Sequence, residues 1–309
     1  SGAASTIGTA TGSNSGATRV SSPSPPTNLG TYYYDFDGSN DHITVNGIVN
    51  AFSGATGSVS FWINADAWDN DTWIWKATYS GDGTSDSTKI GCTINSNGYI
   101  YIEHRDTNSQ NWTIRRTSPT MSTGTWYHIV VTQDGTSPKL YINGETGYTN
   151  GSDGVTFNEG DSNDKTRWYE EEHDEFAFGY SNTYWSNEYD GKITQFLVYD
   201  RVLTNNEIID LYKGSTNGVG GTNGAGLASP VTDGLKCWYD FQQASGAITN
   251  QAVVVDEKAT LLASPTLLQE NTIFEEIDSQ TIYWLQDDIW KTKDWVAPQR
   301  GLFCGDRSS

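Results

Sequence analysis

The sequence predicts an all-β protein built as an antiparallel sandwich. Short runs rich in Val, Ile, Thr, Tyr, Phe and Trp alternate apolar with polar residues, and clusters of Gly, Asn, Asp and Ser separate them. The 309 residues include 32 Gly and a single Met, and 13% of them are aromatic, which favours strands and turns over helices. Near the middle, residues 126–132 and 139–143 flank a turn at Asp134-Gly135, as in a β-hairpin.

The spacing of these runs predicts the other elements of the sandwich. Strands are expected at residues 32–36, 42–45, 58–63, 73–77, 89–94, 99–103 and 111–116. A polar stretch at residues 145–175 is long enough to indicate a functional loop, a lid or an insertion. One helix is predicted after Thr204, because Thr204 and Glu207 form a capping box and Gly214 supplies a stop signal.

The two ends of the chain differ from the sandwich in composition. Residues 1–30 are mostly Ser, Gly, Ala, Thr and Pro, so we expect an extended tail that orders only against a partner or against its own domain. The sandwich is predicted at residues 31–214 and a flexible Gly-rich linker at residues 215–230. Residues 231–309 form a short aromatic region, either a partial second copy or an assembly segment, in which Ile282, Leu285 and Ile289 have helical spacing.

The central hairpin resembles that of laminin-G-like, concanavalin A-like jelly-roll domains. Three further stretches are similar to this family in the same order, at residues 34–45, 59–63 and 189–208. The resemblance spans residues 31–214 and implies an antiparallel jelly-roll β-sandwich with an N-terminal tail and a C-terminal appendage. Because one fold hosts many activities, it does not by itself specify a function.

The net charge of the chain bears on the kinds of molecule that it can bind. There are 18 Lys and Arg against 38 Asp and Glu, so the net charge is −20, which disfavours nucleic acid. No apolar run approaches the length of a membrane span, so insertion into a membrane is not expected. The cysteines Cys92, Cys237 and Cys304 are too few for a disulfide framework, and whether Cys237 pairs with Cys304 stays open.

Aromatic residues in or beside polar loops are candidates for binding glycans. An exposed ring with Asn and Asp neighbours can stack on a sugar while these neighbours bind its hydroxyls. The candidates are Trp68, Trp73, Trp168, Tyr169, Tyr184 and Trp185. For each of them the alternative is ordinary core packing.

Acidic residues suggest two other kinds of site. Asp37, Asn40, Asp41, Glu172 and Asp174 are candidate Ca²⁺ ligands, and laminin-G-like relatives often bind calcium at a sandwich edge; the alternatives are an Asx turn and a solvated acidic loop. The run at residues 170–175 also resembles the catalytic carboxylates of concanavalin A-like glucanases. Its carboxylates precede the apolar pattern that begins at Phe176, which disfavours the paired geometry of a hydrolase.

These observations favour a non-enzymatic function, and no catalytic residue is assigned. His128 is interpreted as structural, because no nucleophile motif accompanies it. The first hypothesis is an extracellular or virion-surface structural protein that presents an adhesive or glycan-binding sandwich and assembles with itself or with other subunits through its terminal regions. The alternatives are a secreted carbohydrate-binding module and, less favoured, a diverged glucan hydrolase.

Overall fold

The computed structural model divides the chain into two units, Ser1–Val253 and Val254–Ser309. It describes residues 11–22, 24–52, 54–68, 72–78, 89–105, 111–116, 120–145, 155–159, 168, 175–179, 188–215, 218–226, 231–243, 248–250, 252, 273–276, 281–286 and 289–293. None of the helices in these ranges combines the length and the hydropathy that a membrane span requires.

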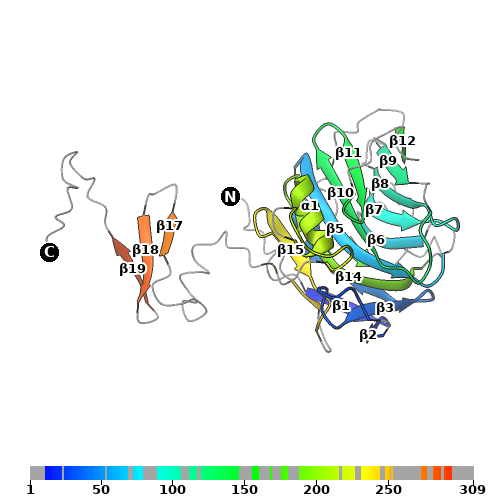
Figure 1. Cartoon of the computed structure of the whole chain (residues 1–309), viewed down its shortest axis with the longest axis horizontal. Helices are drawn as coiled ribbons and strands as arrows, with labels where there is room; N and C mark the ends of the chain where they lie inside the picture. The colour runs from blue at the N-terminus through cyan, green and yellow to red at the C-terminus, as the bar shows by residue number, and fades with distance from the viewer. Residues whose placement is uncertain are drawn as a thin grey trace. The chain divides into compact units, whose positions relative to one another are not determined.

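The first unit is an all-β jelly-roll sandwich of two antiparallel sheets with one short α-helix, as predicted (Figure 1). The nine-stranded sheet has the order β12 (Val155–Glu159), β9 (Asn111–Arg116), β8 (Ile100–Arg105), β7 (Lys89–Ile94), β6 (Thr72–Thr78), β13 (Glu175–Phe178), β4 (His42–Thr44), β1 (Thr11–Ser15) and β16 (Ile248–Thr249). The seven-stranded sheet has the order β11 (Pro138–Ile142), β10 (Tyr127–Asp134), β5 (Thr56–Ala65), β14 (Asp190–Tyr199), β3 (Tyr33–Asp37) and β2 (Thr18–Val20), with β15 (Leu235–Tyr239) also paired to β14.

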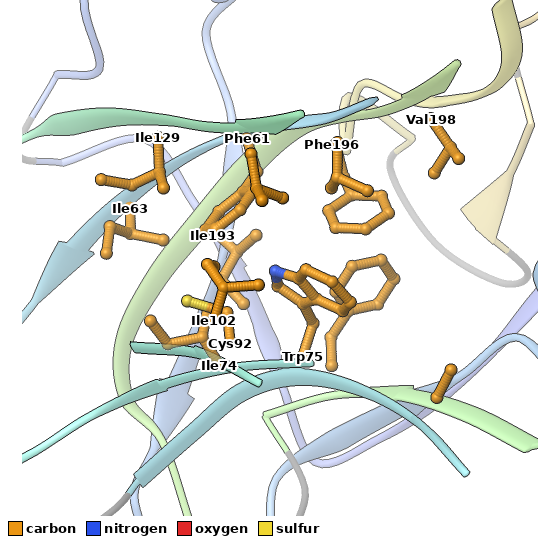
Figure 2. Packing of buried hydrophobic residues seen from close by; sticks show 14 of the residues in the cluster. Phe61, Ile63, Ile74, Trp75, Cys92, Ile102, Ile129, Ile193, Phe196 and Val198 are labelled. Atoms are coloured by element: carbon orange, nitrogen blue, oxygen red, sulfur yellow. The ribbon is translucent and has the colours of Figure 1, made fainter. Parts of the chain in front are cut away.

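The core lies between the two sheets, where alternate side chains of each sheet meet (Figure 2). The seven-stranded sheet contributes Phe61, Ile63, Ile129, Ile193, Phe196 and Val198, and the nine-stranded sheet contributes Ile74, Trp75, Cys92 and Ile102. Trp75 packs edge-on against Phe61 and Phe196, with ring centroids 5.9 and 5.5 Å apart. Facing sheets that interdigitate in this way form the dry centre of a β-sandwich.

The predicted hairpin and helix are both confirmed. β10 pairs with β11 so that Ile129 faces Ile142, and the turn between them is capped by the Asp134 carboxylate, which accepts from the backbone N–H of Thr136 at 2.8 Å. Helix α1 (Asn205–Lys213) begins at the capping box of Thr204 and Glu207 and ends at Gly214, whose φ of 65° is the left-handed conformation that glycine adopts without strain.

The N-terminal segment differs from the predicted tail because part of it belongs to the sandwich. β1 pairs with β4 on one side and with β16 on the other, while β2 pairs with β3. The Arg19 guanidinium lies 3.3 Å from the centroid of the Tyr32 ring and donates to the Gln242 carbonyl at 2.7 Å. Strand pairing uses backbone groups, so a Ser- and Gly-rich segment joins a sheet without an apolar pattern.

The predicted boundary at residues 215–230 is also corrected. The described part of this segment folds back onto the sandwich: Asn28 donates its backbone N–H to Ala225 at 2.7 Å, and Gly226 donates to Tyr212 at 2.8 Å. A side chain at Gly226 would clash with Leu29, since an added Cβ would lie 2.1 Å from the Leu29 Cδ2 atom. Beyond this segment β15 completes the sheet, so the first unit continues to Val253.

The second unit contains a three-stranded antiparallel sheet made of β17 (Ile273–Glu276), β18 (Thr281–Gln286) and β19 (Ile289–Lys293). The helical spacing of Ile282, Leu285 and Ile289 is therefore not realised as a helix. The β-branched and aromatic residues of this segment favour extended backbone, which outweighs the spacing of three apolar positions.

Candidate functional site

The outer face of β6, β7, β8 and β9 carries polar and aromatic side chains instead of apolar ones. Alternation sends the isoleucines of these strands into the core and the intervening residues outward. We call this surface the polar face and define it by Trp73, Lys76, Lys89, Thr93, Tyr101, Glu103, Arg105, Thr113 and Arg115.

Strand register aligns these residues in rows across the sheet. One row runs from Trp73 on β6 through Thr93 on β7 and Tyr101 on β8 to Arg115 on β9. The neighbouring row contains Lys76, Gly91, Glu103 and Thr113 in the same order of strands. Directly opposed residues have Cβ atoms roughly 5 Å apart, so each row is a continuous strip of side chains.

Trp73 is held flat on this face by its neighbours. Its ring lies over Gly91, where an added Cβ would come within 2.8 Å of the ring atom Cζ3. The ammonium groups of Lys76 and Lys89 each lie 4.7 Å from the centroid of the Trp73 ring, within cation–π range. Lys89 also pairs with Glu103 at 3.1 Å. These contacts leave Trp73 only 5% exposed, so the ring forms the floor of the face.

Two polar atoms of the polar face have no partner within the described part of the chain. They are the Thr93 hydroxyl, which lies between the two aromatic residues of its row, and the Arg105 Nε. Both atoms are buried, and a buried donor without an acceptor is costly. The aromatic residue of the face that is partly exposed is Tyr101, whose ring centroid lies 6.0 Å from the Arg115 guanidinium, and this pair suits a ligand that combines a flat apolar surface with oxygen acceptors.

The outer face of the seven-stranded sheet is covered by the chain itself. Helix α1 and β15 bring Ile208, Leu211 and Leu235 together with Tyr199 and Val130 in a second apolar cluster. Beside it the rings of Trp62, His128 and Tyr212 stack at centroid distances of 5.0 and 6.1 Å. Burial lowers the pKa of His128 to about 3, and its Nε2 lies 2.8 Å from the Ser60 hydroxyl, in keeping with the predicted structural role.

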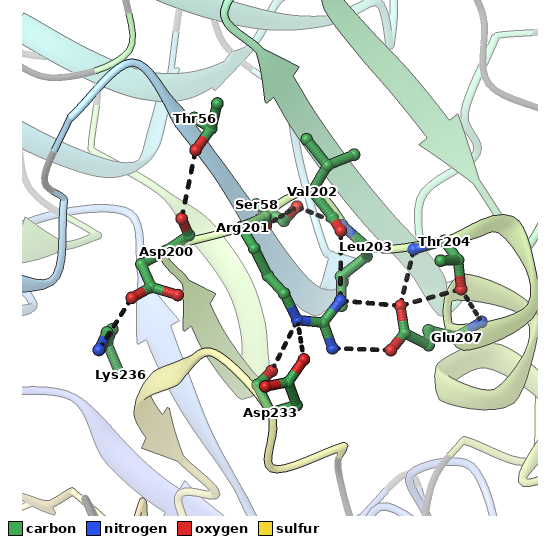
Figure 3. A network of polar contacts seen from close by, with 10 residues as sticks. All are labelled: Thr56, Ser58, Asp200, Arg201, Val202, Leu203, Thr204, Glu207, Asp233 and Lys236. Atoms are coloured by element: carbon green, nitrogen blue, oxygen red, sulfur yellow. Dashed lines mark hydrogen bonds and ion pairs between the residues drawn. The ribbon is translucent and has the colours of Figure 1, made fainter. Parts of the chain in front are cut away.

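A polar network fixes α1 on this covered face (Figure 3). The Arg201 guanidinium donates two hydrogen bonds to Glu207, at 2.7 and 3.0 Å, and its Nε pairs with Asp233 at 2.8 Å. Ser58 on β5 donates to the Arg201 carbonyl and accepts from the Leu203 N–H. The Arg201 hydrogen bonds lower the pKa of Glu207 to about 2. The network joins a strand, the helix start and the segment before β15.

The structure separates the predicted glycan-binding residues. Trp73 is on the polar face. Trp168 is fully buried against Phe52, so the core-packing alternative is correct for it, and Trp68 is half-buried against the core. Tyr169, Tyr184 and Trp185 lie outside the described residues.

The candidate calcium ligands are only partly described. Asp41 is buried and accepts from the Asp37 backbone N–H at 3.0 Å, while Asp37 accepts from the Ser39 N–H at 2.9 Å, so both carboxylates cap a turn. Asn40 is exposed, and Glu172 and Asp174 lie outside the described residues. Among the residues that are described, no group of three or more His, Cys, Asp or Glu side chains is placed to hold a metal ion.

The remaining predicted residues have structural positions. β13 begins at Glu175, and Phe176 is its first buried residue, so the start of the apolar pattern is where the sequence placed it. Within the described residues Cys237 is a free, buried thiol whose pKa is raised by burial, and Cys304 lies outside them. Tyr101, Arg105 and Arg115 were not among the predicted site residues, although the alternation of their predicted strands places them opposite the buried isoleucines.

Several solved structures are similar to this chain at low identity. Domain 4 of the extracellular arabinanase AbnA from Geobacillus stearothermophilus, in complex with arabinotriose, is 17% identical with a TM-score of 0.41, covering 64% of this chain and 86% of that one. The CBM40 of the Ruminococcus gnavus IT-sialidase, bound to α2,3-sialyllactose, is 13% identical with a TM-score of 0.46, covering 57% and 94%. A putative carbohydrate-binding protein from Bacteroides ovatus is 18% identical with a TM-score of 0.39, covering 79% and 55%.

At these identities the likeness concerns the fold alone, and no curated protein matches the sequence. The family model for the concanavalin A-like lectin/glucanases superfamily matches residues 37–209, more than half of the chain. The chain therefore belongs to the concanavalin A-like lectin/glucanase superfamily.

Proposed function

We propose that this protein is a non-catalytic carbohydrate-binding module that acts outside the cell and holds its glycan on the polar face. The observation that carries the proposal is the end of the row on β8 and β9, where the half-buried Tyr101 ring lies 6.0 Å from the guanidinium of the half-buried Arg115. Sugar rings present C–H faces to aromatic rings and hydroxyl groups to polar neighbours.

The membership of the chain in a lectin and glucanase superfamily fits this proposal, because it includes glycan-binding proteins as well as hydrolases. The neighbours named above include domains in complex with arabinotriose and with sialyllactose. A hydrolase stays the less favoured alternative, since retaining hydrolysis needs two carboxyl groups ~5 Å apart. On the described polar face Glu103 is the only carboxylate, and it is paired with Lys89.

The test compares two tyrosines that resemble each other in exposure. Tyr101 lies on the polar face beside Arg115, and Tyr32 lies at the other sheet beneath Arg19. After a glycan array has identified a ligand, Tyr101→Ala should weaken its binding about tenfold or more in calorimetry, since a stacked ring contributes ~1–2 kcal/mol. Tyr32→Ala should bind like the wild type.

Equal effects of the two substitutions would contradict this location of the site. Release of reducing ends from the bound glycan would contradict the non-catalytic assignment and favour the hydrolase. The absence of binding to every glycan on the array would contradict the proposal itself.

The role in assembly is a separate prediction. A structural protein of a virion or cell surface would use its terminal regions to contact other subunits, and the second unit with its own three-stranded sheet is available for this purpose. Light scattering of the full chain with and without a chelator tests both this role and the predicted Ca²⁺. A defined oligomer supports assembly, a chelator-sensitive one supports calcium at the contacts, and a monomer in both conditions contradicts assembly.

A further inference from the structure

The polar face is basic in a strongly acidic protein. Its defined residues include the four cations Lys76, Lys89, Arg105 and Arg115 and a single carboxylate, Glu103. The whole chain carries a net charge of −20, with only 18 Lys and Arg in total. Among these described residues cations outnumber carboxylates, whereas in the whole chain carboxylates outnumber cations.

Several cations elsewhere in the sandwich pair with carboxylates, as Lys89 does with Glu103 on the polar face. Lys192 pairs with Asp35 at 3.3 Å and with Asp66, and Arg201 pairs with Glu207 and Asp233. Lys236 pairs with Asp200 at 2.9 Å. These pairs lie on the seven-stranded sheet and its connections, where they join strands to loops. On that side of the molecule the cations serve the fold.

The two arginines of the polar face keep part of their surface exposed. Arg105 and Arg115 are half-buried and lie on the adjacent strands β8 and β9. A guanidinium group presents several N–H donors in a planar fork, which matches the two oxygens of a carboxylate or the oxygens of a sulfate.

The neighbourhood of these arginines favours a sugar over other polyanions. The Arg115 guanidinium lies beside the Tyr101 ring, and Lys89 lies over the Trp73 ring. The partly exposed Tyr101 ring is therefore next to a cation, which suits a ligand whose apolar ring face and acidic group belong to one residue. The net charge of the whole chain opposes a long phosphate backbone.

We infer that the polar face selects acidic glycans, with Arg105 and Arg115 pairing the acidic groups of sugars that stack on Tyr101. This inference rests on the proposed function and adds the class of ligand. Carboxylates and sulfates share the required chemistry, and the experiment distinguishes them.

Calorimetry on the full wild-type chain compares polygalacturonate, alginate and hyaluronate, each with its methyl-esterified form, which keeps the sugar rings and removes the charge. We expect at least one acidic polymer to bind about tenfold or more tightly than its ester at low salt, and this difference to disappear in 1 M NaCl, where the screening length is ~3 Å. Calorimetry with dextran sulfate and chondroitin sulfate then tells whether sulfate groups are bound as well as carboxylates.

Variants then test the assigned residues. Arg105→Gln and Arg115→Gln should each weaken the acidic ligand about tenfold and thereby remove most of the difference in affinity between the acid and its ester. Lys139→Gln, which removes a cation from β11 of the other sheet, should have no effect. The comparison of acid with ester in the wild-type chain does not depend on whether the variants fold.

Each other outcome has a defined meaning. Equal affinity for acid and ester contradicts the acidic class and leaves the proposed function intact. No binding to any acidic or neutral glycan contradicts both. Equal binding of every polyanion, including dextran sulfate and DNA, with the same loss in Arg105→Gln, contradicts recognition of a sugar and indicates a general anion-binding surface.

Discussion

The outer faces of the two sheets arise from the same alternation of side chains, and they differ in what lies on them. On the seven-stranded sheet the outward residues mix apolar and aromatic side chains with buried polar ones such as Ser60 and Thr132, and helix α1 covers part of this face (Figure 1). On β6 to β9 of the nine-stranded sheet the outward residues are lysines, arginines, threonines and two aromatics. The covered face stabilises the fold, and the polar face is the one that we propose for binding.

Truncation should have the largest effect on this comparison. A chain limited to residues 31–214, the domain predicted from the sequence, lacks β1, β2 and β15 and exposes apolar residues such as Leu197. We expect a loss of roughly 5–10 kcal/mol of unfolding free energy, since each large apolar side chain contributes ~1.5–3 kcal/mol, and no cooperative thermal transition in circular dichroism. A chain ending at Val253 is the control and should melt like the full chain. Equal stability of all three chains would show that β1, β2 and β15 do not contribute to the stability of the sandwich.

Single substitutions on the two faces should separate stability from binding. Trp62→Ala removes a ring that is 2% exposed and stacked on His128, so it should destabilise the protein by about 3–5 kcal/mol. Tyr101→Ala on the polar face should change the unfolding free energy by less than about 1 kcal/mol and reduce glycan binding. Urea titration of both variants measures the first effect. The comparison fails if Tyr101→Ala destabilises the protein as strongly as Trp62→Ala.

Acid should weaken the covered face through His128. Burial lowers the pKa of His128 in the folded state from 6.5 to about 3. Between these two pH values the imidazole is therefore protonated in the unfolded state and neutral in the folded state. This contribution to stability is therefore complete above pH 6.5 and decreases as the pH falls toward 3, by at most about 1.4 kcal/mol per pH unit. The unfolding free energy, measured by urea titration at several pH values in this range, should depend less steeply on pH for His128→Gln than for the wild type. Parallel slopes would mean that His128 is not the group responsible.

The network of Arg201 should have the smallest of these effects. Glu207→Gln keeps the shape of the capping box and removes the charge that pairs with Arg201, which should cost about 1–2 kcal/mol at pH 7. The folded-state pKa of Glu207 is depressed to about 2, so its contribution is present above the ordinary value of 4.5 and is lost as the pH falls from there toward 2. Wild type and variant should converge in stability over this range, and a constant difference would contradict the assignment.

The sequence by itself determined the features that depend on neighbouring residues. The turn at Asp134-Gly135 and the alternation around Ile129 specify β10 and β11, and the capping box at Thr204 specifies the start of α1. These signals are local, because a turn, a cap or a strand face is defined within a few residues. The sequence also predicted the first buried residue of β13, Phe176, from the local apolar pattern.

Only the tertiary structure decided which distant segments meet. The Ser- and Gly-rich N-terminal segment has no apolar pattern, yet its backbone pairs with β4 and β16. β15 pairs with β14, although it follows a Gly-rich segment that the sequence predicts to be a linker. Trp168 lies in a polar sequence and is nevertheless buried against Phe52. The row from Trp73 to Arg115 depends on the register of four strands, and a shift of one residue would turn each of its side chains to the opposite face. Register between strands depends on contacts across the whole sheet, so no stretch of the sequence read alone could place these residues together.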